Sequence, residues 1–228
     1  MTNEANNNCG HRRRIKDKFL KDRLAENFLD YEVLELALFY AIPRRDVKPL
    51  AKNLMEKFKK ISELINADKD KVLSVTGPND SVYILLKLMR EITKRSLKEE
   101  IAKKNVISSW TALINYLRFA MSFKNVEQLR VLFLNKSNEL IADEVLSNGT
   151  IDQTLIYPRE VVKKSLYYSA SAIILVHNHP SGSSRPSKSD IEMTRSVIAV
   201  CKAVDIEVHD HIIICKSDFY SFKKNLLI

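Results

Sequence analysis

The stretch that decides the fold is Ala172-Ile-Ile-Leu-Val-His177-Asn-His179-Pro180-Ser-Gly-Ser-Ser-Arg-Pro186-Ser187-Lys-Ser-Asp190. It opens with a short apolar, β-branched run, which predicts a buried strand. The strand ends in two histidines one residue apart, and a loop rich in Gly, Pro and Ser leads into a helix start. Because alternate side chains of a strand point the same way, we expect His177 and His179 to converge on one point. The loop is long enough to bring Asp190 back towards them.

Two imidazoles and one carboxylate form a catalytic zinc set that leaves a fourth position open for water. Each part also has a simpler explanation. A His-x-His pair by itself is a weak signal for metal. The Ser187-Lys-Ser-Asp190 segment fits the capping box that opens many helices. The two interpretations of Asp190 are compatible, because a capped helix start would hold a metal ligand rigidly.

The composition is that of an ordinary globular protein. The chain has 228 residues, 45% hydrophobic and 29% charged, which allows one large domain or two small ones. No apolar run approaches the ~18 residues of a membrane span. Residues 1–10 are polar and Asn-rich, so we expect them to be disordered and not a signal peptide. Cys9, Cys201 and Cys215 make no disulfide framework, which favours reduced thiols and a cytoplasmic location.

Positive charge is concentrated in the first half of the chain. Residues 1–105 contain 23 lysines and arginines against 16 acidic residues, a net charge of +7, while residues 106–228 carry +2. A basic half favours DNA or another polyanion as a partner. A solvated, lysine-rich helical surface explains the same charge, and the composition leaves both explanations open.

The first half of the chain predicts an all-helical domain over residues 11–105. Apolar residues recur at helical spacing in several segments, and Asp30 is the expected N-cap of a helix over 31–41. Two later helices are joined by Val75-Thr-Gly77-Pro78-Asn-Asp80. A tight glycine turn between helices is the core of a helix-hairpin-helix, which binds DNA phosphate through backbone N–H groups. Pro78 has no N–H, so a plain turn is the alternative.

The pattern changes near residues 105–109, and residues 106–228 predict an α/β domain. Helices alternate with strand patterns and turns, which indicates a mixed sheet flanked by helices. The expected helices are 110–121, 158–169 and 188–203. The expected strands are 129–134, 139–145, 172–177 and 208–215, with one further strand possible at 150–157.

The second half resembles a known family. The pattern His177-x-His179, seven residues, Ser187, two residues and Asp190 matches the JAMM motif of the JAB/MPN metalloproteases. The wider context resembles the bacterial RadC branch of that family. The residues that carry this further likeness are Gly149-Thr150, Tyr157-Pro158-Arg159-Glu160, His177-Asn-His179-Pro-Ser-Gly182, Pro186-Ser187 and Asp210-His211.

The helical half is similar to the N-terminal region of RadC proteins, notably over Phe39-Tyr-Ala-Ile-Pro-Arg-Arg-Asp-Val-Lys-Pro-Leu-Ala51. RadC proteins usually carry a two-glycine hairpin there. This chain has a degenerate version, Thr76-Gly77-Pro78-Asn79. The departure weakens the DNA-binding role that the family resemblance implies.

The resemblance implies a zinc-dependent metalloprotease-like hydrolase acting on an amide or isopeptide bond. His177, His179 and Asp190 would hold Zn²⁺, which lowers the pKa of a bound water to about 7. Glu127 would be the general base and then acid, with Glu144 as the alternative, and Ser187 would hydrogen-bond the oxyanion.

Other readings of the second half stay open. His209-Asp210-His211 is a second histidine pair that could compete for metal, although the resemblance favours a supporting role for Asp210 and His211. The expected partner is a protein or peptide substrate. The alternative function is a DNA-associated repair or recombination protein that uses residues 11–105. A purely structural metal site is disfavoured, because three ligands and a base leave an open position.

Overall fold

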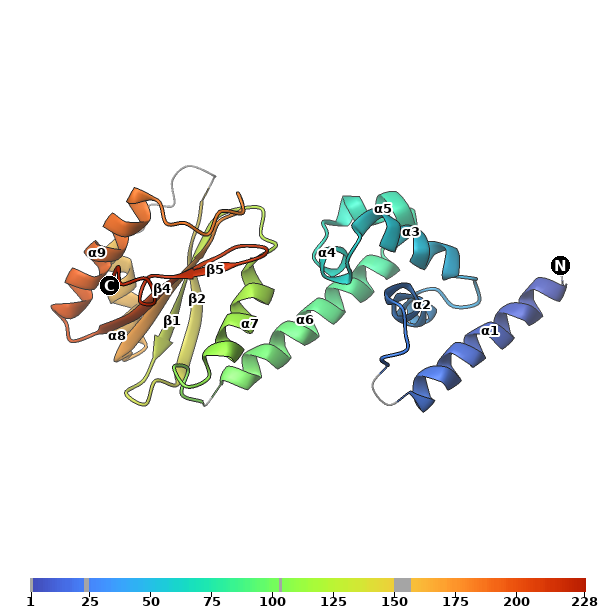
Figure 1. The fold of residues 1–228 in the computed structure, drawn as a ribbon, viewed down its shortest axis with the longest axis horizontal. Helices are drawn as coiled ribbons and strands as arrows, with labels where there is room; N and C mark the ends of the chain where they lie inside the picture. Colours follow the sequence, from blue (N-terminus) through green and yellow to red (C-terminus); the bar gives the residue numbers. More distant parts are fainter. Residues whose placement is uncertain (1, 23–24, 103, 150–156) are drawn as a thin grey trace. The chain divides into compact units, whose positions relative to one another are not determined.

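The computed structural model describes residues 2–22, 25–102, 104–149 and 157–228, and these form two compact units (Figure 1). The first unit ends at Thr93 and the second begins at Lys94, inside helix α6 (Ser81–Ile101). The boundary expected from the sequence lies near residues 105–109, after the end of α6. Leu97 and Ile101, in the last turns of α6, pack into the core of the second unit.

The first unit is all-helical, as the sequence predicts. Its helices are α1 (Thr2–Lys21), α2 (Asp30–Ala41), α3 (Lys48–Phe58), α4 (Ile61–Ile65), α5 (Lys69–Thr76) and most of α6. They enclose one apolar core that includes Leu38, Leu54 and Leu86.

Two details of the first unit differ from the predictions. Residues 2–10, for which the sequence predicts disorder, belong to the first turns of α1 in the structure. Asp30 is the first residue of α2 and not its N-cap, which is Leu29. The Glu32 carboxylate accepts the Leu29 N–H at 3.0 Å, so a side chain inside the helix does the capping.

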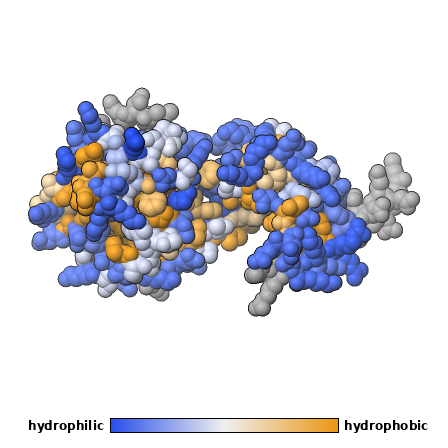
Figure 2. Space-filling model, viewed as in Figure 1, coloured by the Kyte–Doolittle hydropathy of each residue, from blue (hydrophilic) through white to orange (hydrophobic). Residues whose placement is uncertain are grey.

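One of the basic side chains of α1 has a structural role. The Arg12 guanidinium donates to the carbonyl oxygens of Phe39 at 3.2 Å, Ile42 at 2.7 Å and Arg45 at 2.5 Å. The carbonyls of Phe39 and Ile42 lie at the C-terminal end of α2, where helical hydrogen bonds run out and the helix dipole is negative, and that of Arg45 lies in the segment that follows. Arg13 and Arg14 remain exposed. Figure 2 shows that hydrophilic residues cover most of the visible face of this unit.

The turn after α5 has few backbone groups left for a phosphate. Gly77 adopts φ = 81°, which glycine tolerates best, and its N–H donates to the Leu73 carbonyl at 2.9 Å. The Asn79 side chain accepts the Ser81 N–H at 2.9 Å. Together with the missing N–H of Pro78, these bonds favour the plain inter-helix turn.

The second unit is built on a mixed five-stranded sheet. Its elements are α7 (Trp110–Met121), β1 (Gln128–Leu134), β2 (Leu140–Asn148), α8 (Pro158–Tyr167), β3 (Ala172–Asn178), α9 (Lys188–Lys202), β4 (Glu207–Ile214) and β5 (Phe219–Ser221). The strand order is β2-β1-β3-β4-β5, with only β3 and β4 parallel. The mixed sheet is confirmed. The short strand β5 was not predicted, and the expected strand at 150–157 lies almost wholly outside the described residues.

Helices cover both faces of the sheet (Figure 1). The side chains of β1 alternate, so Leu132 and Leu134 pack towards α7 and the end of α6, whereas Val131 and Phe133 pack towards α8 and α9. Both layers are needed because β1 and β3 are buried along their whole length.

The sheet topology brings three chain segments to one edge. In the parallel unit β3-α9-β4, the C-terminal end of β3 lies beside the N-terminus of α9. Strand β1 runs antiparallel to β3 and pairs Leu129 with His177, so its N-terminal end reaches the same place.

Two further expectations concern membrane spans and cysteines. None of the helices in the described ranges combines the length and apolar composition needed to cross a membrane. Cys201 and Cys215 are both free and buried.

Candidate functional site

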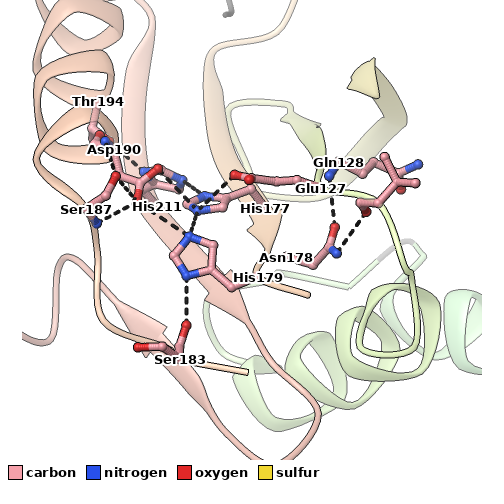
Figure 3. A network of polar contacts seen from close by, with 11 residues as sticks. Glu127, Gln128, His177, Asn178, His179, Ser183, Ser187, Asp190, Thr194 and His211 are labelled. Carbon is pink, nitrogen blue, oxygen red and sulfur yellow. Dashed lines mark hydrogen bonds and ion pairs between the residues drawn. The ribbon is translucent and has the colours of Figure 1, made fainter. Parts of the chain in front are cut away.

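Four side chains meet at the end of β3. They are Glu127 before β1, His177 at the end of β3, His179 just after it and Asp190 in the first turn of α9. One ligand atom from each lies within 4.8 Å of the others. Figure 3 shows the two imidazoles between the carboxylates of Asp190 and Glu127. All four had been singled out from the sequence.

The nitrogen and oxygen atoms of this cluster are close enough to share one cation. The Nε2 atoms of His177 and His179 are 2.7 Å apart. Asp190 Oδ1 lies 3.4 Å from Nε2 of His177, and Oδ2 lies 3.5 Å from Nε2 of His179. Glu127 Oε1 is 4.0 Å from Nε2 of His177, a longer separation than that of Asp190.

The capping box predicted at the start of α9 is present. Ser187 is the N-cap, its Oγ accepts the Asp190 N–H at 3.1 Å, and its own N–H donates to Asp190 Oδ2 at 2.7 Å. The Ser187 hydroxyl also donates to Asp190 Oδ2 at 2.7 Å. These bonds hold the Asp190 carboxylate against the helix N-terminus, where the helix dipole favours a negative charge.

The hydrogen bond at Nδ1 of His179 shows which ring nitrogen carries the proton. Its Nδ1 lies 2.7 Å from the carbonyl oxygen of Ser183, which can only accept a hydrogen bond. Nδ1 therefore carries the proton, and the lone pair of the neutral ring is on Nε2, the atom that faces the cluster.

A chain of hydrogen bonds assigns His177 in the same way. The Thr194 hydroxyl donates to the Asp190 carbonyl at 2.5 Å, so its oxygen is left to accept from Nδ1 of His211 at 2.5 Å. In neutral His211 the lone pair is then on Nε2, which accepts from Nδ1 of His177 at 2.7 Å. The lone pair of His177 is thus also on Nε2. Both histidines present the atom that a metal ion needs.

Burial is the main cause of the pKa shifts of His177 and His211. It lowers the pKa of His177 to about 4, and it lowers the pKa of the fully buried His211 well below the usual value. Both rings are therefore neutral near pH 7, as metal binding and the tautomer assignment require. Burial also opposes a charge on His179, but Asp190 and the Ser183 carbonyl raise the pKa of His179 overall.

The two carboxyl groups are shifted in opposite directions. Burial works to raise the pKa of Asp190, but the bond from His179, the nearby His177 and the Ser187 cap outweigh it and leave the pKa well below its usual range. Burial raises the pKa of Glu127, and the charge of Asp190 adds to the effect. Asp190 is thus an anion, and Glu127 is the more readily protonated of the two.

The alternative base, Glu144, belongs to a different surface. It lies on β2, where its carboxylate binds Nζ of Lys164 at 2.8 Å and accepts the hydroxyl of Tyr168. These contacts lower its pKa. The cluster of Glu127, His177, His179 and Asp190 does not include Glu144.

The second histidine pair does not form a rival site. His209 Nε2 lies 2.5 Å from the side-chain oxygen of Asn138, away from the cluster. Asp210 accepts the backbone N–H groups of His211 at 2.7 Å and Lys223 at 2.9 Å. These contacts agree with the supporting role expected for Asp210 and His211.

Sequence reasoning missed four of the residues labelled in Figure 3: Gln128, Asn178, Ser183 and Thr194. A signal existed for Thr194, because it follows Asp190 by four residues and so lies on the same face of α9. Asn178 and Ser183 gave no such signal, since their partners lie far away in the sequence or are backbone atoms.

The donor set suits a divalent metal ion. Two imidazole nitrogens and one carboxylate match the ligands of catalytic zinc sites, although other first-row metals accept the same donors. The buried contacts of His177 to His211 supply the outer hydrogen bond that orients a ligating histidine.

One family comparison covers this region. A family model described as RadC-like JAB domain matches residues 107–227, which is more than half of the chain and includes every residue of the cluster.

Proposed function

The chain belongs to the RadC-like JAB domain family, and we propose that it is a zinc-dependent hydrolase that cleaves an amide or isopeptide bond in a protein or peptide. The observation that carries the proposal is the meeting of two histidines, one anionic aspartate and one further carboxylate within 4.8 Å. Three such ligands leave room for water and substrate, which a purely structural zinc site does not.

Each residue has a separate role in this proposal. His177, His179 and Asp190 would hold the zinc ion, which polarises a carbonyl group and makes water acidic. Glu127 takes a proton from the attacking water and returns it to the leaving nitrogen. Its distance of 4.0 Å from Nε2 of His177 supports a base beside the ligands.

Ser187 has a structural role already and a catalytic one only by proposal. Its hydroxyl donates to Asp190, so an oxyanion would have to compete with that carboxylate for the same proton. Donation to the oxyanion would require the hydroxyl to turn towards the substrate. Loss of one oxyanion donor typically costs roughly 10²–10³ in rate, which Ser187→Ala would reveal.

The test combines metal analysis with a search for cleaved bonds. Wild-type protein should retain about one zinc ion per chain after purification, and His177→Ala should lose it. Glu127→Gln should keep the metal but produce none of the new amino termini that wild-type protein generates in a proteome-derived peptide library. Glu144→Gln is the matched control, with the same chemical change outside the cluster.

Two results would contradict the proposal. One is wild-type protein that binds no divalent metal. The other is a set of new termini that is the same for wild type and Glu127→Gln, because the carboxylate would then have no part in the cleavage. If Glu144→Gln abolishes cleavage instead, the base has been assigned to the wrong residue.

A second function, DNA binding by the first unit, is favoured by the exposed basic side chains of α1: Arg13, Arg14, Lys16, Lys18 and Lys21. If they contact phosphates, affinity should fall steeply with salt, and the double variant Arg13→Gln/Arg14→Gln should reduce that salt slope. Arg12 is unsuitable for this test because it caps α2. Absence of DNA binding at low salt would exclude this function.

A further inference from the structure

Asn178 stands between the two histidines in sequence, yet its side chain points away from them. Figure 3 shows its amide directed at the segment that carries Glu127. Its oxygen accepts the Gln128 N–H at 3.0 Å, and its nitrogen donates to the Val126 carbonyl at 3.1 Å. Asn178 therefore holds the backbone on both sides of Glu127. It is 1% exposed, so water does not replace these bonds.

The two bonds occur where the sheet itself ends. The pairing of β1 with β3 runs from Leu134 to Leu129, opposite His177, and stops there. Glu127 lies two residues before Leu129, outside the ladder. The Asn178 side chain supplies the next pair of hydrogen bonds in place of the strand backbone.

The other side of the segment is held by β2. The Gly149 N–H donates to the Glu127 carbonyl at 3.0 Å, and the Gln128 side chain donates to Asn148 at 2.7 Å. Val126 and Gln128 are thus fixed through Asn178, and the Glu127 carbonyl is fixed through Gly149. The Glu127 side chain leaves the backbone between these points and reaches the metal-binding cluster.

We propose that Asn178 is the positioning residue for Glu127. This inference rests on the proposed function, in which Glu127 moves the proton. A neutral amide is suited to the task because it accepts an N–H and donates to a C=O at the same time; an aspartate can only accept. A carboxylate that drifts by about 1 Å costs on the order of 10² in rate, so the clamp acts on turnover.

The first test needs neither metal nor substrate. In the metal-free protein, the Gln128 amide should exchange its hydrogen on the order of tenfold faster in Asn178→Ala than in wild type, because it loses a buried acceptor. The Gly149 amide should change much less. Gln128→Ala is the matched control, since it removes the bond to Asn148 and leaves the backbone N–H on Asn178. Unchanged protection of the Gln128 amide in Asn178→Ala would overturn the inference.

The second test asks whether the clamp matters for turnover. For the peptide cleaved fastest in the library, Asn178→Ala should lower kcat on the order of 10²-fold, with KM and zinc content unchanged. Gln128→Ala, which loses only the bond to Asn148 and keeps both bonds of Asn178, should lower kcat much less than Asn178→Ala. Equal kcat in wild type and Asn178→Ala would overturn the positioning role even if the amide exchanges faster.

A conservative variant covers the case in which Asn178→Ala does not fold. Asn178→Asp keeps the acceptor for the Gln128 N–H but loses the donor to Val126, so protection of Gln128 should survive while kcat still falls. A kcat equal to wild type in this variant would show that the Val126 bond is not needed. If neither wild type nor any variant cleaves a peptide, the proposed function fails. Hydrogen exchange at the Gln128 amide then decides by itself whether Asn178 holds the segment that carries Glu127.

Discussion

Replacing Asp143 by Asn should destabilise the second unit strongly. Asp143 lies on β2 with its side chain 1% exposed, and its Oδ1 is 2.5 Å from Nη1 of Arg130, which is 9% exposed. It also accepts the hydroxyl of Tyr116, and Nζ of Lys98 lies 3.9 Å from it. The substitution removes the negative charge and leaves the guanidinium buried without a counter-ion.

The expected loss follows from the burial of the pair. Removing one partner of a buried ion pair costs about 3–5 kcal/mol, because the other charge stays desolvated. For a unit of this size that corresponds to a fall in Tm of about 10–20 °C. The matched control is Glu144→Gln, the next residue of β2. Its partner is the partly exposed Lys164, and such a pair contributes about 1 kcal/mol or less.

The assay can be confined to the second unit. Trp110 is the only tryptophan in the chain and packs against that unit's core, so its fluorescence during urea denaturation reports the unfolding of that unit. Equal midpoints for Asp143→Asn and Glu144→Gln would refute the reasoning. The double variant Arg130→Met/Asp143→Leu should recover most of the loss, since it removes both charges.

Three further predictions concern other contacts. Thr194→Val should weaken zinc binding about 10–100-fold, measured in competition with a chelator. The substitution removes the oxygen that accepts from Nδ1 of His211, and His211 in turn sets the tautomer of His177. An unchanged affinity would contradict the tautomer assignment. Arg12→Gln should destabilise the first unit by about 1–2 kcal/mol in urea unfolding, whereas Arg13→Gln should have almost no effect, because only Arg12 caps α2. Burial and then the charge of Asp143 raise the pKa of the Tyr116 hydroxyl well above its usual value. The folded protein therefore keeps this proton above pH 10 while the unfolded chain loses it, so stability should fall as the pH rises above 10, and less so in Tyr116→Phe.

Much of the fold was predictable because its signals are local. Trp110–Met121 was predicted as a helix with the bounds that the structure has, and β3 was predicted to within one residue. The domain boundary was not predictable from the same signals. α6 is a single continuous helix, so its periodicity does not reveal that its last turns belong to the other core.

The candidate site was predictable in part for the same reason. His177 and His179 are related by the strand period, and Asp190 by the spacing of a capping box. Glu127 came from a family resemblance, with Glu144 left as an alternative. The structure separates the two by placing Glu127 in the cluster and Glu144 beside Lys164.

The sequence by itself determined an all-helical first half, a mixed sheet in the second, and a strand that ends in two converging histidines beside a capped aspartate. Each of these predictions uses a local pattern of apolar, turn or capping residues. Only the tertiary structure decided which glutamate joins them, and that Asn178 holds the segment carrying it. Those facts depend on the antiparallel register of β1 on β3, which pairs residues about fifty positions apart, and no local period encodes that pairing.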